Sequence, residues 1–126
     1  MNRLAWVALA VGLGACGQHI DDRPITVQYV TETILAPSCG TAECHSAFKQ
    51  EDGYVFDTVD SALTSINNSG LVVCGEPEGS YLIQVMTRTK DRMPEDQPIA
   101  NKDLELLEDW IANETGSDGV VCVGGQ

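Results

Sequence analysis

The most informative part of this sequence is the stretch CGTAECH at residues 39–45. It holds two thiols separated by four residues, and an imidazole directly after the second thiol. Thiols and imidazoles bind borderline metals, and thiols also form covalent bonds to carbon and to each other. We therefore expect the surrounding chain to fold around a disulfide, a metal ion or a covalently held group at this point.

The histidine beside the second cysteine favours a covalently held haem. Two thiols can add across the two vinyl groups of a haem, each giving its sulfur to one carbon and its hydrogen to the other. The adjacent imidazole is then in reach of the iron. The usual motif is Cys-x-x-Cys-His, and the gap here is two residues longer, which costs roughly 0.3–0.6 kcal/mol of loop-closure entropy. Cys39 and Cys44 are therefore candidates for haem attachment, and His45 for an iron ligand.

This stretch resembles the attachment motif of small c-type cytochromes, in the variant with four residues between the cysteines. Arg92-Met93-Pro94 is similar to the loop that supplies the second axial ligand, and residues 103–115 are similar to the helix after that loop. The resemblance covers about residues 25–115 and extends to cytochrome-like lipoproteins of bacterial envelopes. It implies an all-α, small cytochrome c-like domain of about four to five short helices with long loops. It also implies one covalent haem c, with His45 and Met93 as axial iron ligands.

The first fifteen residues are typical of a targeting segment. Arg3 precedes an almost entirely apolar run at residues 4–13, which is too short to span a bilayer as a helix. Small residues directly before Cys16 are what lipoprotein signal peptidase accepts. We expect a signal peptide at 1–15, a lipid on Cys16, a tether at 16–24, the domain at 25–116 and a tail at 117–126. An ordinary secretory signal with a chance cysteine is the alternative.

The chain is strongly acidic, with 19 Asp and Glu against 7 Lys and Arg and a net charge of −12. Such a surface repels phosphate backbones and argues against nucleic acid as a partner. It suits basic redox partners in the cell envelope, although acidity that serves only solubility explains it equally well. The expected localisation is a periplasm-facing or surface lipoprotein, anchored in the inner or the outer membrane.

Four cysteines remain once Cys16 carries a lipid, and an even number in an oxidising compartment indicates that every thiol is used. If Cys39 and Cys44 attach haem, as the resemblance implies, Cys74 and Cys122 are left to form a disulfide. Such a bridge closes a long loop and would contribute about 3–4 kcal/mol to stability.

Apolar spacing predicts four helices. The first covers residues 26–36 and the third covers 78–87. The second runs to residue 67 after a cap at Asp57 or Thr58, and the fourth covers 102–113 after a cap at Asn101. We expect Pro37 to end the first helix and residues 42–49 to form a short helical turn. Aromatic residues are only 6% of the chain, so a core this poor in rings would gain from a large flat insert such as haem.

Three cations precede the expected methionine ligand, as a local exception on an acidic chain. They either pair with the haem carboxylates or offset nearby acidic residues. The cations are Arg88, Lys90 and Arg92, and the acids are Asp91, Glu95 and Asp96.

Other interpretations of the same residues remain open. A haem-free lipoprotein domain stapled by Cys39–Cys44 and Cys74–Cys122 disulfides would serve as an interaction or structural module. A zinc site could use Cys39, Cys44 and His45, and a peroxidase-like iron site would leave Met93 unbound. His19 and Met86 are weaker ligand candidates, better read as a linker residue and a core residue. The sequence shows no nucleophile–base pair or phosphate loop, so we predict electron transfer and no enzyme activity.

Overall fold

The computed structural model describes residues 21–122, which form helices and long loops with no strand among them. The all-α class expected from the sequence is therefore confirmed. The predicted signal peptide, the lipidation site Cys16 and His19 lie outside the described residues. Within the described part, no helix combines the length and the apolar character that crossing a bilayer requires.

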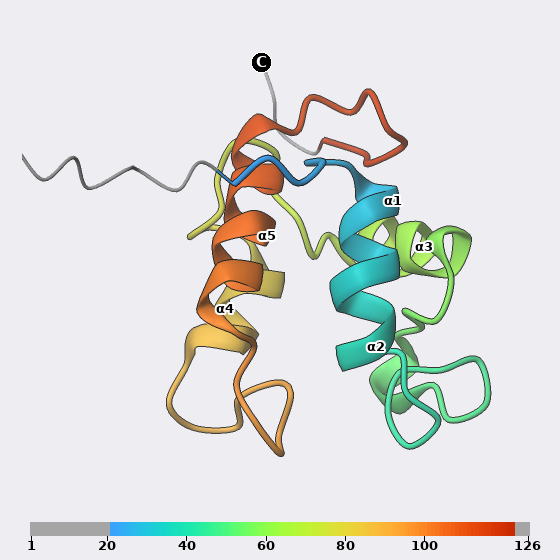
Figure 1. The fold of residues 1–126 in the computed structure, drawn as a ribbon. Coiled ribbons are helices and arrows are strands. Elements are labelled where there is room, and N and C mark those ends of the chain that lie inside the picture. The colour runs from blue at the N-terminus through green and yellow to red at the C-terminus, as the bar shows by residue number, and fades with distance from the viewer. Residues whose placement is uncertain (1–20, 123–126) are drawn as a thin grey trace, which may run out of the picture.

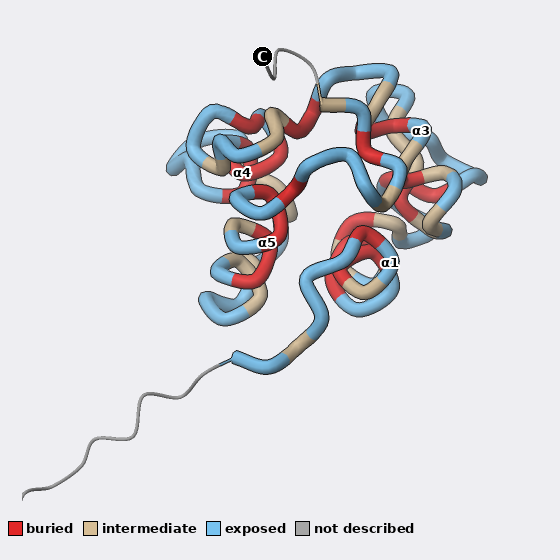
Figure 2. The backbone as a smooth tube through the Cα atoms, turned by 90° about the horizontal axis from the view of Figure 1, so that it is seen from above, coloured by how far each residue is buried: buried red, intermediate tan, exposed pale blue. Residues whose placement is uncertain are grey.

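The helices form two halves with the core between them (Figure 1). One half contains α1 (Val27–Val30), α2 (Ala36–Ser38) and α3 (Val59–Ser69), and the other contains α4 (Tyr81–Thr87) and α5 (Asn101–Asn113). α1 contacts α3 and α5, and α4 contacts α5. Figure 2 shows that the buried positions of these helices lie toward the interior. The largest fully buried side chains include Trp110, Ile34, Leu35, Ile66 and Leu107.

The first helix continues beyond the point where we expected Pro37 to end it. α1 begins after Thr26, whose hydroxyl accepts a hydrogen bond from the Tyr29 amide, and leads into the π-helix η1 (Thr31–Leu35) and then α2. The wider π turn shifts the hydrogen-bond register, so the amide of Ala36 donates to the carbonyl of Thr31. Pro37 has no amide hydrogen to donate, and it is accommodated in the first turn of α2.

Residues 42–49 form consecutive turns, and no helix is assigned there. The short helical turn expected in this stretch is limited to one α-turn, in which the Gln50 amide donates to the Ser46 carbonyl at 2.9 Å. The backbone of this segment also bonds to more distant residues. The amide of His45 donates to the carbonyl of Cys39 at 3.0 Å, and the amide of Phe56 donates to the carbonyl of His45 at 2.7 Å. These bonds fold the cysteine stretch back on itself, and a continuous helix would leave no carbonyls for them.

The later helices agree with the sequence in number and shift slightly in their bounds. Thr58 caps α3 through a capping box with Ser61, and Gly70 ends the helix with a positive φ of 59°. α4 begins at Tyr81, three residues later than expected, because the Ser80 hydroxyl bonds to loop groups, including the Glu76 carbonyl. Asn101 is the first residue of α5 and does not act as its cap.

The C-terminal segment is bound to the domain at several points. Cys74 and Cys122 form a disulfide, and Val120 is 3% exposed within the core. The side chain of Asn67 donates to the Gly119 carbonyl and accepts from the Val121 amide. Residues 117–122 therefore complete the core, beyond the disulfide that the sequence indicated.

Candidate functional site

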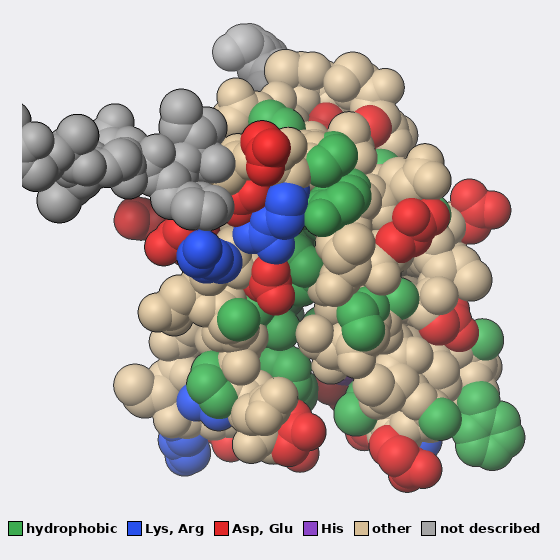
Figure 3. Space-filling model, in the orientation of Figure 1, with side chains coloured by type: hydrophobic (Ala, Val, Ile, Leu, Met, Phe, Trp, Pro, Cys, Tyr) green, Lys and Arg blue, Asp and Glu red, His purple; other side chains and the backbone are tan. Residues whose placement is uncertain are grey.

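The two longest loops lie at the same end of the molecule. One follows α2 and carries the cysteine-histidine stretch, and the other joins α4 to α5 and carries Met93 (Figure 1). Two hollows lie between them, and both are lined by Cys39, His45, Asp52 and Met93. We call the two together the cleft. Figure 3 shows the surface hollowed between the two halves, with acidic side chains spread over the face in view.

The inner hollow is narrow and mainly apolar, with a volume of about 80 Å³. Besides the four shared residues, its lining consists of Tyr54, Phe56, Leu71, Tyr81, Leu82, Val85, Met86 and Arg88. The outer hollow is open to the loops, includes Cys44 in its lining and measures about 950 Å³. Pockets for cofactor-sized ligands span roughly 300–1,000 Å³, so the outer hollow is large enough for one.

His45 is 9% exposed, and its ring is fixed by a hydrogen bond from Nδ1 to the backbone carbonyl of Glu51 at 2.9 Å. A carbonyl only accepts, so Nδ1 carries the hydrogen, and in the neutral ring Nε2 keeps its lone pair. This is the arrangement of a metal-binding histidine, in which the second nitrogen is held by a backbone or carboxylate acceptor. The sequence predicted His45 as a ligand, and the structure leaves its Nε2 available for that role.

The carbonyl that orients His45 belongs to an unusual turn. Gln50 and Asp52, on either side of Glu51, have positive φ angles of 50° and 53°. Such angles are unfavourable for residues with a Cβ and persist where the surroundings enforce them. The ring also packs against Phe56, with centroids 5.6 Å apart, and Tyr54, at 5.8 Å. Backbone and aromatic contacts thus hold the imidazole from several sides.

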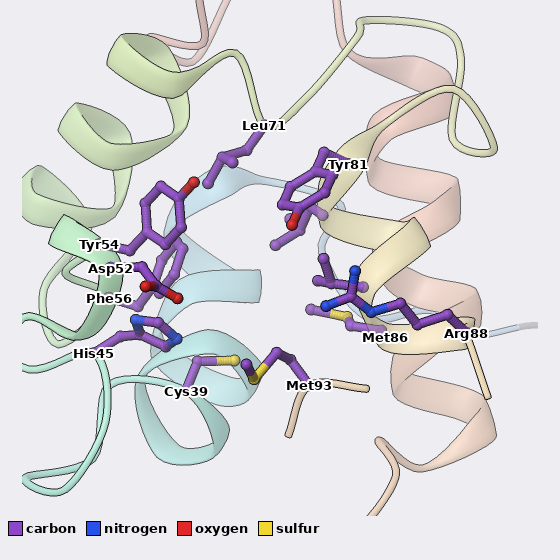
Figure 4. Close-up of a pocket in the computed structure, with 12 residues that line it drawn as sticks. Cys39, His45, Asp52, Tyr54, Phe56, Leu71, Tyr81, Met86, Arg88 and Met93 are labelled. Carbon is purple, nitrogen blue, oxygen red and sulfur yellow. The ribbon is translucent and has the colours of Figure 1, made fainter. Parts of the chain in front are cut away.

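Met93 approaches the cleft from the opposite half. Its amide donates to the carbonyl of Val85 at 2.8 Å, which holds the loop against α4. Figure 4 shows His45 on one wall, with Met93 and Met86 reaching in from the other half. Met86 is 4% exposed and belongs to the core, as the sequence suggested, yet it also lines the inner hollow.

Cys39 and Cys44 are free thiols with different surroundings. Cys39 is buried and Cys44 is exposed. Burial, followed by the proximity of Cys44, raises the pKa of the Cys39 thiol to about 12. Cys39 is therefore a neutral thiol at physiological pH, the form whose S–H adds to a carbon–carbon double bond.

These residues fit a covalently held haem. One neutral buried thiol and one exposed thiol line the outer hollow with a histidine whose Nε2 is available. A methionine sulfur lies across the cleft from that histidine, and the inner lining is mainly apolar and aromatic. Histidine and methionine are the ligand pair of c-type haems that transfer electrons.

A comparison with protein families agrees with this arrangement. Residues 42–97 match the model of the family described as Planctomycete cytochrome C. This match supports a cytochrome c-like domain in the chain. The matched stretch includes Cys44, His45 and Met93 and begins three residues after Cys39. No curated protein and no solved structure matches the chain. At the level of the family, the match indicates haem-based electron transfer.

Most of the site residues predicted from the sequence lie around one cleft. Cys39, Cys44, His45 and Met93 do so, whereas the Cys74–Cys122 disulfide joins the loop before α4 to the C-terminal segment. Asp52 and Tyr81 also line the cleft, and neither was predicted there from the sequence. The Asp52-Gly53 pair could have indicated this position, since such a pair is typical of a tight turn and follows soon after the predicted ligand His45. Nothing in the side chain of Glu51 reveals that its carbonyl orients His45.

Proposed function

We propose that this protein is an electron carrier with one haem c, tethered to a membrane of the bacterial cell envelope. The observation that carries the proposal is the hydrogen bond from His45 Nδ1 to the Glu51 carbonyl, which leaves Nε2 for a metal. A bound haem supplies a one-electron iron couple. Cys39 and Cys44 would hold it through thioethers, and His45 and Met93 would serve as its axial ligands.

The side chains around the cleft suit electron transfer without turnover. The ring contacts of Tyr54 and Phe56 with His45 hold the imidazole in place, and Leu71, Leu82 and Val85 give the inner hollow an apolar lining. A rigid, apolar surrounding limits reorganisation when the charge changes. If His45 and Met93 both bound the iron, no position on the metal would remain for a substrate, and we propose no enzyme activity.

The anchor and the partners complete the proposal. A lipid on Cys16 would hold the domain at the membrane surface through the short tether. Durable anchoring takes more than one acyl chain, and lipoproteins carry two or three. The net charge of −12 favours electron-transfer partners with a basic docking face. The corresponding location is the periplasm-facing or outer surface of the cell envelope.

The decisive experiment is expression with and without a cytochrome c maturation system. The protein made with the system should be red, with a Soret band, and acid-acetone should not extract the pigment. The Cys39→Ser/Cys44→Ser double variant is the control and should lose the pigment or release it on extraction. A colourless wild-type protein with Cys39 joined to Cys44 would instead support the haem-free, disulfide-stapled domain.

The anchor needs its own test. Cys16→Ser should move the protein from the membrane fraction to the soluble periplasmic fraction, and the wild-type N-terminal peptide should carry fatty acids by mass spectrometry. A wild-type protein cleaved before Cys16 without a lipid, or cleaved elsewhere, would rule out the lipoprotein part and leave the haem proposal standing.

A further inference from the structure

Two charged side chains line the inner hollow, and they come from opposite walls. Asp52 lies on the His45 side, and Arg88 lies at the end of α4. Figure 4 shows the guanidinium of Arg88 beside Met86, with the hydroxyl of Tyr81 pointing into the same space. Among the described residues, Arg88 forms no ion pair with a carboxylate.

Arg88 directly follows α4 and continues a face of that helix that is turned to the cleft. Tyr81, Val85 and Arg88 are spaced four and three residues apart, so they lie in one row along the helix. All three line the inner hollow. The row therefore presents an apolar middle with a hydrogen-bond donor at each end, a pattern suited to a ligand with a flat apolar body and polar groups at its edge.

The charge of Arg88 is not neutralised within the described chain. Its Nε donates to the backbone carbonyl of Asp91 at 2.6 Å, which fixes the side chain but adds no countercharge. Across residues 21–122, the ion pairs are Arg23–Asp21, Arg23–Asp103 and Lys49–Glu51. The sequence left open whether the cations near Met93 offset neighbouring acids, and none of them forms such a pair. The terminal nitrogens of Arg88 remain for an external anion.

We propose that Arg88, assisted by the hydroxyl of Tyr81, binds the carboxylates at the edge of the haem; this rests on the proposed function. A guanidinium offers a planar set of donors that matches a carboxylate in two-point contact. Asp52 on the opposite wall repels the same carboxylates and directs them toward Arg88. Arg92 has a buried Nε without a partner, but it lines neither hollow, so the assignment is to Arg88.

The test is the reduction potential of the red holoprotein. A cation next to the haem carboxylates favours the reduced iron, so Arg88→Gln should lower the midpoint potential. Lys90→Gln is the matched control, because Lys90 is an exposed cation two residues away that lines neither hollow. Its effect should be smaller and should vanish in high salt. In high salt, part of the fall in midpoint potential caused by Arg88→Gln should remain, since salt screens a contact pair less than distant charges. Tyr81→Phe should give a smaller downward shift.

Each outcome decides the matter. Equal shifts for Arg88→Gln and Lys90→Gln, or a shift that salt abolishes in both, would overturn the assignment. If Arg88→Gln is made without haem, Arg88→Lys and Arg88→Met separate charge from packing. Haem taken up by the lysine variant and not by the methionine variant supports a charge contact, and haem taken up equally by the methionine variant overturns it. A wild-type protein that takes up no haem refutes the proposed function itself, which separates the two failures.

Discussion

Gly40 packs so closely against Phe56 that a Cβ atom on residue 40 would lie 2.7 Å from the carbonyl carbon and oxygen of Phe56. The contact brings the loop between the two cysteines onto the segment that carries the aromatic wall of the cleft. The sequence alone marks Gly40 only as a spacer between Cys39 and Cys44, whereas the structure makes it the point where two parts of the site meet.

Gly40→Ala should therefore destabilise the domain, by about 1–3 kcal/mol for a forced overlap with backbone, and should reduce covalent haem incorporation. Gly79→Ala is the control, since the nearest atom to its Cβ is an ordinary 3.4 Å away. Denaturant unfolding and the haem-to-protein ratio measure the two effects. Equal stability of the two variants would show that the contact at Gly40 is not close in solution.

Met93→Leu should remove the sulfur–iron charge-transfer band of the oxidised protein and lower its midpoint potential, because methionine ligation raises the potential of a haem. Met86→Leu is a matched control, since Met86 lines the same inner hollow and the change nearly conserves volume. The band should persist in that variant. The reverse pattern, with the band lost only in Met86→Leu, would make Met86 the ligand.

In protein made without a haem maturation system, Cys44 should react with iodoacetamide more than about tenfold faster than Cys39 at pH 8. The thiolate is the nucleophile, and burial raises the pKa of the Cys39 thiol to about 12 while Cys44 is exposed. Peptide mass spectrometry over a time course gives the two rates. Similar rates would mean that the thiol of Cys39 is not buried in the haem-free protein.

The double variant Cys74→Ser/Cys122→Ser should lower the free energy of unfolding by about 3–4 kcal/mol, the value for a loop of this length. Haem attachment should survive, because this disulfide lies outside the residues that line the cleft. Denaturant unfolding of oxidised wild-type protein and of the variant gives the difference. Loss of haem from a variant that remains folded would connect the disulfide to the site.

Glu114 should make stability depend on pH. Burial, and then a hydrogen bond with the Asp118 carboxyl, raises the pKa of Glu114, and Asp118 in turn accepts from the amide of Val27 at the start of α1. A raised pKa means that the native state holds the proton more tightly. The contribution is complete below the ordinary glutamate pKa of 4.5 and is lost as the pH rises through the raised value.

Glu114→Gln should flatten this part of the stability profile, measured as the free energy of unfolding from about pH 4 to 8. The exposed Glu105→Gln makes the same charge change as a control. A profile for Glu114→Gln that follows wild type would show that Glu114 does not titrate differently in the folded state.

The sequence by itself determined the class of the fold and the chemistry available to it. The apolar spacing of a helix and a capping box such as that of Thr58 involve residues only three or four positions apart. The bounds of α3 and α5 could therefore be predicted to within a few residues. The Cys44-His45 pair and Met93 were visible because their chemistry depends on residue type and adjacency. The predicted end of the first helix at Pro37 was wrong by two residues, because a π turn precedes Pro37 and a linear apolar pattern does not indicate one.

Only the tertiary structure decided how these groups are held. The Glu51 carbonyl that orients His45 has no side-chain signature, because every residue carries the same carbonyl. Asp52 and Arg88 face one hollow from segments far apart in the chain, and the close approach of Gly40 to Phe56 depends on how the loop folds back. Such relationships arise when distant segments exclude water from a shared interior, and the local order of residues does not encode them.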